Sequence, residues 1–144
     1  MRTFKFLSLL FIAVSVGFAS CKKDDKEDTT VTSNATLIVG KWKKTKEVET
    51  EYNSNGKGPV HTDSTFTSSD YVEYKSNGQC VVSDGFLITL NYQVDGSKIT
   101  YKYVGVAYGE ETIKSINSTQ LVTEETDDEG NGTKYVTVTT YTKM

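Results

Sequence analysis

Apolar and polar positions alternate most clearly between Phe86 and Val104, in the stretch FLITLNYQVDGSKITYKYV. Alternation with a period of two is typical of a β-strand with one buried face. Its first half carries the apolar set Phe86, Ile88, Leu90, Tyr92 and Val94. Asp95-Gly96 suits a two-residue type I′ turn, which pairs Val94 with Ser97 and places the apolar residues of both strands on one face. The stretch therefore predicts an antiparallel hairpin.

Similar patterns recur along the chain, separated by turn residues. They predict strands at Lys41–Tyr52, Tyr71–Tyr74, Gln79–Ser83, Thr112–Ile116, Leu121–Thr126 and Lys134–Thr142. The Gly- and Asn-rich segment from Asn53 to Pro59 is expected to break the chain, and no useful helical period is visible. About eight strands joined by short hairpins predict an all-β, up-and-down antiparallel barrel, because closure removes exposed strand edges. A two-sheet β-sandwich is the alternative.

Composition agrees with this fold class and limits the partners. The chain has 144 residues, is rich in Thr, Tyr and Val, and holds one Pro. It carries 16 Lys and Arg residues against 19 Asp and Glu residues, which gives a net charge of −3. Because nucleic-acid binding needs a face of clustered basic residues, we expect no nucleic-acid partner.

The N-terminal segment has the features of a targeting signal. Arg2 and Lys5 precede an apolar run from Phe6 to Phe18, which is shorter than the roughly 20 residues that a helix needs to cross a bilayer. The run ends in two small residues followed by Cys21. Residues 1–20 are therefore predicted to be a signal peptide.

The end of that signal, Phe18-Ala19-Ser20-Cys21, resembles the lipobox of bacterial lipoproteins, with Phe18 in place of the usual Leu. The resemblance implies that Cys21 is acylated, becomes the mature N-terminus and anchors the protein to a membrane through its acyl chains, palmitate among them. The alternative is a plain secretory signal with a chance cysteine. If Cys21 is acylated, Cys80 is left as a single thiol, and its strand context indicates a small buried side chain.

Residues 21–36 are predicted to be a charged, flexible tether, because mixed charge of the density of KKDDKED (Lys22 to Asp28) cannot form a packed core. This segment also resembles the export signal of surface-exposed lipoproteins in some gram-negative bacteria. The resemblance implies a lipid-anchored protein of the outer membrane at the cell surface. The alternative is a simple spacer on the periplasmic face.

The folded domain, residues 37–144, is similar to lipocalin-like lipoprotein domains. The similarity begins with the G-x-W of Gly40-Lys41-Trp42 and continues in YVEYKSNG, NYQVDGSKITY and IKSINSTQLV to the closing YTK. It implies that Trp42 plugs one end of the barrel. It also implies that a basic residue of the last strand stacks on the tryptophan, and here Lys143 stands in place of the usual Arg.

Two groups of residues are candidates to line a ligand site. Lys44 and Lys46 share the face of Trp42 in a regular strand. Because a buried Lys is costly unless paired, either a β-bulge turns them away or they line a wet cavity mouth that favours an anionic ligand. Five tyrosines lie on the inferred inward face, namely Tyr52, Tyr74, Tyr92, Tyr101 and Tyr103. They either line a pocket for an aromatic or amphipathic ligand or simply fill a small barrel.

No catalytic or metal-binding constellation is found. His61 is the only histidine and is expected in a surface loop. The loop that begins at Asp127 partly matches the start of a calcium-binding EF-hand, but its twelfth position is Val138, which has no ligand atom. Glu110 and Glu111 are adjacent, so on a strand they point to opposite faces and cannot act together. We therefore expect no metal, no cofactor and no enzymatic activity.

The sequence as a whole predicts a membrane-anchored lipoprotein that binds a small apolar or amphipathic ligand in a lipocalin-like barrel. The alternative is a surface interaction or structural lipoprotein with a filled barrel and no small-molecule ligand.

Overall fold

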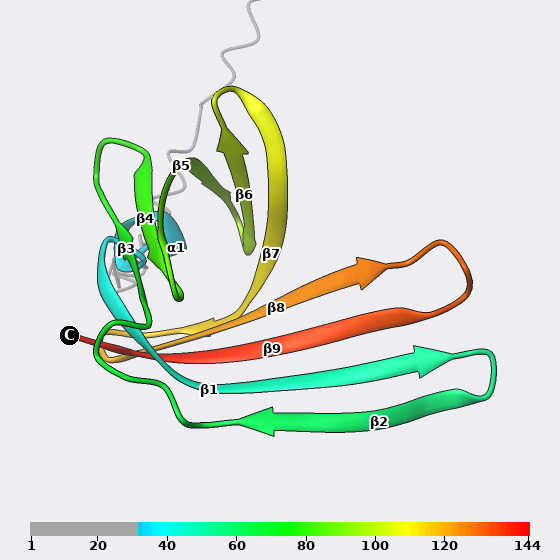
Figure 1. Cartoon of the computed structure of the whole chain (residues 1–144). Helices are drawn as coiled ribbons and strands as arrows, with labels where there is room; N and C mark the ends of the chain where they lie inside the picture. The colour runs from blue at the N-terminus through cyan, green and yellow to red at the C-terminus, as the bar shows by residue number, and fades with distance from the viewer. Residues whose placement is uncertain (1–31) are drawn as a thin grey trace, which may run out of the picture. The chain divides into compact units, whose positions relative to one another are not determined.

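The computed structural model of this chain describes residues 32–144, and the predicted signal peptide, Cys21 and most of the predicted tether lie outside that range. The described part consists of one short helix followed by strands (Figure 1). In chain order the elements are α1 (Asn34–Leu37), β1 (Gly40–Asn53), β2 (Gly56–Asp63), β3 (Tyr71–Tyr74), β4 (Gln79–Ser83), β5 (Leu87–Asp95), β6 (Lys98–Tyr103), β7 (Val106–Ile116), β8 (Gln120–Asp128) and β9 (Lys134–Lys143). Within residues 32–144, no helix is long and apolar enough to cross a membrane.

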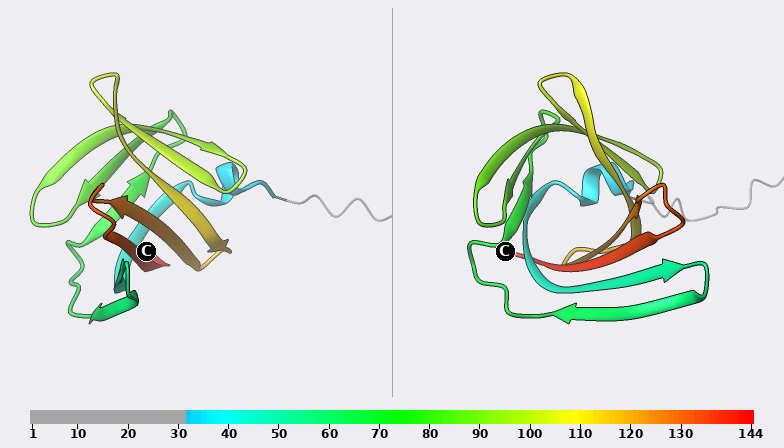
Figure 2. Two further views of the ribbon diagram at one scale, coloured as in Figure 1. Left: turned by 90° about the vertical axis from the view of Figure 1, so that its right-hand side faces the viewer. Right: turned by 45° about the vertical axis from the view of Figure 1, so that its right-hand side comes forward.

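The strands form one antiparallel sheet that closes on itself, as Figure 2 shows. Its order is β2-β1-β3-β4-β5-β6-β7-β8-β9, and β1 also pairs with β9. The barrel thus contains every strand except β2, which is attached to the outside edge of β1. The predicted all-β, up-and-down antiparallel barrel of about eight strands is confirmed, and the alternative sandwich does not form.

The long strand β1 has different partners along one edge. Its first residues, Gly40–Lys43, pair with β3, whereas the part from Glu47 to Asn53 pairs with β2. Along its other edge β1 pairs with β9 over nearly its whole length. The barrel is therefore closed where β1 begins and is prolonged at the other end by a four-stranded sheet, β2-β1-β9-β8. We call these the closed end and the open end.

The predicted break at Asn53–Pro59 is wrong, because this segment makes a tight turn and enters β2. Asn53 lies opposite Gly56, and the ladder continues to Glu47 opposite Asp63. Pro59 is tolerated because β2 is an edge strand, where a missing N–H breaks no central ladder. His61 accordingly lies exposed on a strand opposite Glu49, not in a loop.

The predicted β5–β6 hairpin forms, but its turn is Gly96-Ser97 and not Asp95-Gly96. Val94 therefore lies opposite Ile99, and Tyr92 opposite Tyr101. Gly96 has φ +58° and Ser97 has no positive φ, which suits a turn with Gly at its first central position. The pairing differs from the prediction by two residues, so every side chain keeps its expected face.

A β-bulge at Thr45 exchanges the two faces of β1. Lys44 lies opposite Tyr141 and Lys46 opposite Thr140, so Thr45 is the extra residue. The Thr45 hydroxyl donates a hydrogen bond to the carbonyl oxygen of Thr140 at 3.0 Å. Beyond the bulge Glu47 points inward and Lys46 outward.

This exchange corrects the predicted inward face of Tyr52, which lies on the outer face opposite Lys134. In a regular strand Val48 would share the face of Trp42, but it lies on the outer face opposite Val138.

The apolar core is concentrated at the closed end. The side chains of Ile38, Trp42, Ile99 and Leu121 have no exposed surface. Trp42 donates its Nε1 hydrogen to the carbonyl oxygen of Ile38 at 2.6 Å, so the one polar group of the indole is satisfied. Further from this core the inward positions become progressively polar, and the candidate site lies there.

Candidate functional site

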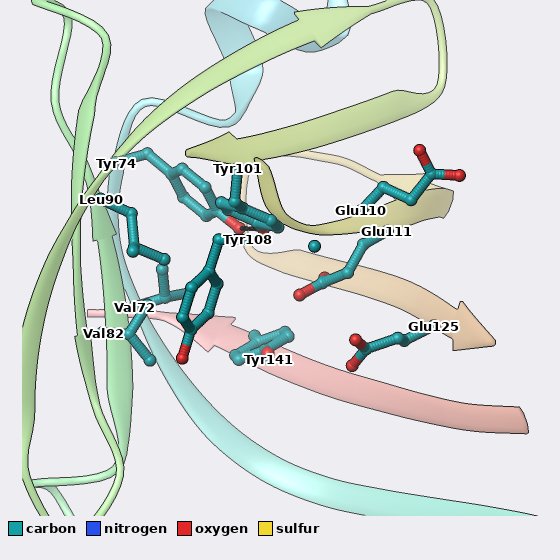
Figure 3. A pocket seen from close by; sticks show the side chains of 11 residues that line it. Val72, Tyr74, Val82, Leu90, Tyr101, Tyr108, Glu110, Glu111, Glu125 and Tyr141 are labelled. Carbon is teal, nitrogen blue, oxygen red and sulfur yellow. Dashed lines mark hydrogen bonds between the residues drawn. The ribbon is translucent and has the colours of Figure 1, made fainter. Parts of the chain in front are cut away.

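Between the apolar core and the open end, the barrel contains a cavity of about 150 Å³ that is partly open to solvent. Figure 3 shows its lining. One wall is apolar and is made by Val72, Val82 and Leu90 from β3, β4 and β5. The remaining lining consists mainly of the tyrosines Tyr74, Tyr101, Tyr108 and Tyr141 and the carboxylates Glu111 and Glu125.

A second cavity of about 160 Å³ adjoins the first. Both are lined by Val72, Val82, Glu111, Glu125 and Tyr141. From the second cavity an open acidic trough leads along the sheet extension, and it is lined by Glu49, Glu125, Asp127, Glu129, Tyr135 and Thr137. Because Glu125 and Thr137 line both the second cavity and the trough, the interior is connected to the solvent on an acidic path.

Glu111 is the most buried carboxylate of this interior. It lies on β7 opposite Ile99. Its neighbour Glu110 also belongs to the lining, but the Glu110 carboxylate forms an ion pair with Lys98 at 2.6 Å. Oε2 of Glu111 is inaccessible to solvent and has no hydrogen-bond partner among residues 32–144. Such an atom is rare in a folded protein and calls for a specific cause.

Burial raises the pKa of Glu111 above its ordinary value. The hydroxyl of Thr123 opposes this shift, the negative charge of Glu125 adds to it, and Tyr101 and Lys44 lower it by smaller amounts. The net effect is a raised pKa, which means that the ionised form of Glu111 is less favourable in the folded protein than in water.

Glu125 lies beside Glu111 because of the pairing between β7 and β8. Ile113 is opposite Thr123, and two residues further along the same face this register brings Glu111 next to Glu125. Both carboxyl groups point into the pocket in Figure 3. Burial raises the pKa of Glu125, and the charges of Asp127 and Glu47 raise it further.

The tyrosines form another part of the wall. The hydroxyls of Tyr74 and Tyr101 are hydrogen-bonded to each other at 2.6 Å, and the ring of Tyr74 packs edge-to-face on Tyr92. Burial raises the pKa of Tyr74, Tyr101 and Tyr141 well above the ordinary range. These phenols are therefore neutral, and they offer hydroxyl groups and π-faces but no charge.

The structure separates the two lysines that the sequence grouped together. Lys44 points inward and lines the second cavity, with Nζ 3.1 Å from Glu47 and 2.8 Å from Asp84. Desolvation lowers the pKa of Lys44, but its hydrogen bonds to Asp84 and Glu47 outweigh this, so that the pKa is raised. Lys46 is exposed on the outer face. The bulge thus turns away only one lysine, and the other is already neutralised by two carboxylates.

Of the five candidate tyrosines, Tyr74 and Tyr101 line the first cavity. Tyr92 is half-buried and donates its hydroxyl hydrogen to the carbonyl oxygen of Lys75. Tyr52 is 39% exposed on the outer face, and Tyr103 is 50% exposed at the open end.

The sequence reasoning missed the lining residues Tyr108, Glu111, Glu125 and Tyr141. Tyr108 is the extra residue of a β-bulge, because Ala107 lies opposite Lys102 and Gly109 lies opposite Tyr101. No sequence pattern indicated this bulge. The two glutamates meet only through strand pairing, which becomes visible once the register of β7 and β8 is known.

Trp42 and Lys143 are brought together at the closed end. Lys143 Nζ lies over the indole, 4.7 Å from the ring centroid, and donates a hydrogen bond to the carbonyl oxygen of Val39 at 3.1 Å. A cation over an indole face is a stabilising arrangement. The pair lies at the opposite end of the barrel from the acidic trough.

The other singled-out residues do not assemble a reactive site. Cys80 is a buried free thiol, and burial raises its pKa to about 11, which disfavours the nucleophilic thiolate. In the part of the chain that the structure describes, no three His, Cys, Asp or Glu side chains are arranged to hold a metal ion. Cys21 lies outside that part.

Comparison with known proteins finds no match for this chain. The chain matches no family model, and neither a curated protein nor a solved structure matches it.

Proposed function

We propose that this chain is a lipid-anchored lipoprotein whose lipocalin-like barrel binds a small amphipathic ligand without catalysing a reaction. The observation that carries the binding function is the unfilled interior. A barrel of this size can fill completely with its own side chains, yet this one keeps two adjoining cavities beyond its apolar core.

The size of the cavities limits the ligand. A space of about 150 Å³ holds a group of the size of benzene. Sites for drug-sized molecules begin at about 300 Å³, so one cavity alone, at about 150 Å³, is too small for such a ligand. A ligand with one ring or a short chain fits, provided that its polar group reaches the carboxylates of the inner wall.

Gly109 offers a direct test of the binding function. It lines the cavity, has no positive φ, and a Cβ added there would lie 3.9 Å from Glu125 Oε1 as its nearest neighbour. Gly109→Ala therefore fits, whereas the larger side chain of Gly109→Leu must occupy the cavity. A strand tolerates either residue better than Gly.

Native mass spectrometry of protein purified from its own cells would provide the measurement. We expect a co-purified small molecule with the wild type and with Gly109→Ala, and none with Gly109→Leu. Equal masses of bound material in all three proteins would contradict binding in the barrel.

The proposed anchoring rests on the residues around Cys21. Metabolic labelling with palmitate should mark the wild type, and Cys21→Ala should abolish the label while Cys80→Ala keeps it. Label that survives Cys21→Ala would overturn the proposed anchor.

The proposed location at the surface of the outer membrane rests on KKDDKED, Lys22 to Asp28. Protease added to intact cells should degrade the wild type. It should spare a variant in which these seven residues are replaced by Ser and Gly. Protection of the wild type would favour the periplasmic face of the outer membrane.

One observation favours the alternative of an interaction protein with no small ligand. Large apolar side chains are exposed at the open end, around the connections from β4 to β5 and from β6 to β7. These residues are Phe86, Leu87, Tyr103, Val104, Val106 and Tyr108. Exposed apolar groups at one place commonly mark contact surfaces. A wild-type protein that carries no small molecule in the mass measurement would support this alternative.

A further inference from the structure

The chemistry of the cavity wall indicates what kind of ligand it takes. Oε2 of Glu111 is buried and has no hydrogen-bond partner among residues 32–144. The carboxyl group that carries this atom points into the pocket in Figure 3. A buried acceptor left without a donor costs roughly 1–3 kcal/mol, and more when it is charged. A ligand that brings a hydrogen-bond donor to this atom would recover that cost on binding.

The charges around Glu111 indicate that the donor is cationic. Glu125 lies next to it, and Glu47, Asp127 and Glu49 line the path from there to the solvent. The one basic side chain that lines these spaces in the described structure, Lys44, already forms ion pairs with Glu47 and Asp84. The interior therefore has an excess of negative charge, which attracts a cation and repels an anion.

We propose that the barrel binds a small organic cation whose protonated amine donates hydrogen bonds to Glu111 and Glu125. The apolar part of this ligand lies against Val72, Val82 and Leu90, and the aromatic ring of Tyr108 covers it from the open end. This inference rests on the proposed binding function and adds to it the class of ligand. It replaces the anionic ligand that Lys44 and Lys46 suggested from sequence.

A proton shared between the two carboxyls is the competing explanation for the unpartnered oxygen. In that case a hydrogen bond between Glu111 and Glu125 would satisfy the oxygen without any ligand. The cavity would then show no preference for the charge of a ligand. The two explanations therefore differ in what they expect from ligands of the same shape and different charge.

The test compares three probes of nearly equal size: benzylamine, which is protonated at pH 7, neutral benzyl alcohol and anionic benzoate. Their single ring matches a cavity of about 150 Å³. Affinities would be measured by ligand-observed NMR titration of the folded domain at one fixed salt concentration, because salt screens charged groups. We expect benzylamine to bind about tenfold or more tightly than benzyl alcohol, and benzoate to bind weakest.

Glu111→Gln keeps the shape of the side chain and removes its charge. It should weaken benzylamine about ten- to a hundredfold and leave benzyl alcohol nearly unchanged. Glu124→Gln is the matched control, since Glu124 is the neighbour of Glu125, forms an exposed pair with Lys114 at 3.2 Å and lines neither cavity. It makes the same change in net charge and should leave the affinity of all three probes unchanged.

The outcomes separate this inference from the binding function. If benzyl alcohol binds as tightly as benzylamine and Gly109→Leu blocks both, the barrel binds ligands but the cationic class is wrong. The same conclusion follows if Glu111→Gln leaves benzylamine unaffected. If no probe binds the wild type at millimolar concentration, both the cationic class and the proposed binding site are wrong.

Discussion

At the scale of single residues, Glu111 shows a conflict between stability and binding. A core position that served only to hold the fold would carry an apolar side chain or a fully paired polar one. Glu111 instead presents an unpartnered buried oxygen beside a second carboxylate. Proteins keep such costly groups where function requires them, and this is the physical reason to look for the ligand here.

The raised pKa of Glu111 makes a prediction about stability and pH. Because the folded protein binds this proton more tightly than the unfolded chain, the free energy of unfolding falls as pH rises from the ordinary pKa of Glu through the raised one. Glu111→Gln cannot titrate and removes this loss. We expect the variant to gain stability relative to the wild type between about pH 4 and pH 7, because only the wild type loses stability as this proton is released.

The measurement is urea unfolding of both proteins at pH 7 and near pH 4, where the gain should shrink because Glu111 is then largely protonated. Glu124→Gln should change the stability by less than about 0.5 kcal/mol at either pH, as exposed ion pairs contribute little. A stability difference between Glu111→Gln and the wild type that is the same at both pH values would contradict the raised pKa of Glu111.

At the scale of elements, the bulge in β1 decides which side chains enter the barrel. Without the extra residue Thr45, Lys46 and Val48 would point inward and Glu47 and Glu49 outward. The part of the inner wall that β1 contributes would then be basic and apolar, whereas Glu111 and Glu125 on β7 and β8 would stay in place. The hydrogen bond from the Thr45 hydroxyl to Thr140 holds this bulge.

Thr45→Val tests that hydrogen bond, since it removes the hydroxyl and keeps the side-chain shape. We expect a loss of about 1 kcal/mol in the free energy of unfolding, measured by urea denaturation. Thr50→Val is the control, because Thr50 lies on the outer face of the same strand and its side chain makes no hydrogen bond in the described structure. Equal effects of the two substitutions would mean that the hydroxyl does not hold the bulge.

The start of β1 depends on a glycine. Gly40 has φ +136°, and a Cβ added there would lie 2.7 Å from Lys143 Cε, the side chain that covers Trp42. Gly40→Ala should therefore destabilise the protein by more than about 1 kcal/mol. Gly85→Ala, with φ +71° and open space around it, should cost less, and thermal unfolding would compare them. A Gly40→Ala variant as stable as Gly85→Ala would contradict the close packing of Lys143.

The elements show which parts of the fold the sequence could predict. The β3–β4 hairpin forms with its predicted bounds, because turn residues and apolar alternation agree there. By contrast, β2 was missed because Gly56, Gly58 and Pro59 resemble a loop, and only pairing with β1 makes them a strand. The bulge at Thr45 has no local sequence signature, since it depends on where β9 pairs.

The candidate site was less predictable than the fold for the same reason. Tyr74 and Tyr101 could be assigned to the interior by alternation alone. The meeting of Glu111 with Glu125 depends on the register between two strands, and the inward position of Glu47 depends on a bulge. Long-range pairing therefore determines the charge of the cavity, and a local pattern cannot reveal it.

At the scale of the whole molecule, the two ends of the barrel have different roles. The closed end holds the apolar core, the Trp42–Lys143 pair and α1, whose Asn34 side chain donates to the carbonyl oxygen of Gly96 in the β5–β6 turn. The open end holds the acidic trough and the exposed apolar side chains. The apolar core is thus at one end, and the acidic groups lie toward the other.

The last residue of the chain also lies at the closed end, where the backbone N–H of Met144 donates to the carbonyl oxygen of Lys41 at 2.9 Å. The domain should therefore accept a circular permutation. A short Gly-Ser linker would join Met144 to Thr32, and new ends would open in the exposed β8–β9 loop, between Gly130 and Asn131. We expect the permuted domain to keep its β-rich circular dichroism spectrum and a cooperative thermal transition. A permuted chain that fails to fold would show that the β8–β9 connection is needed to bring the last two strands together.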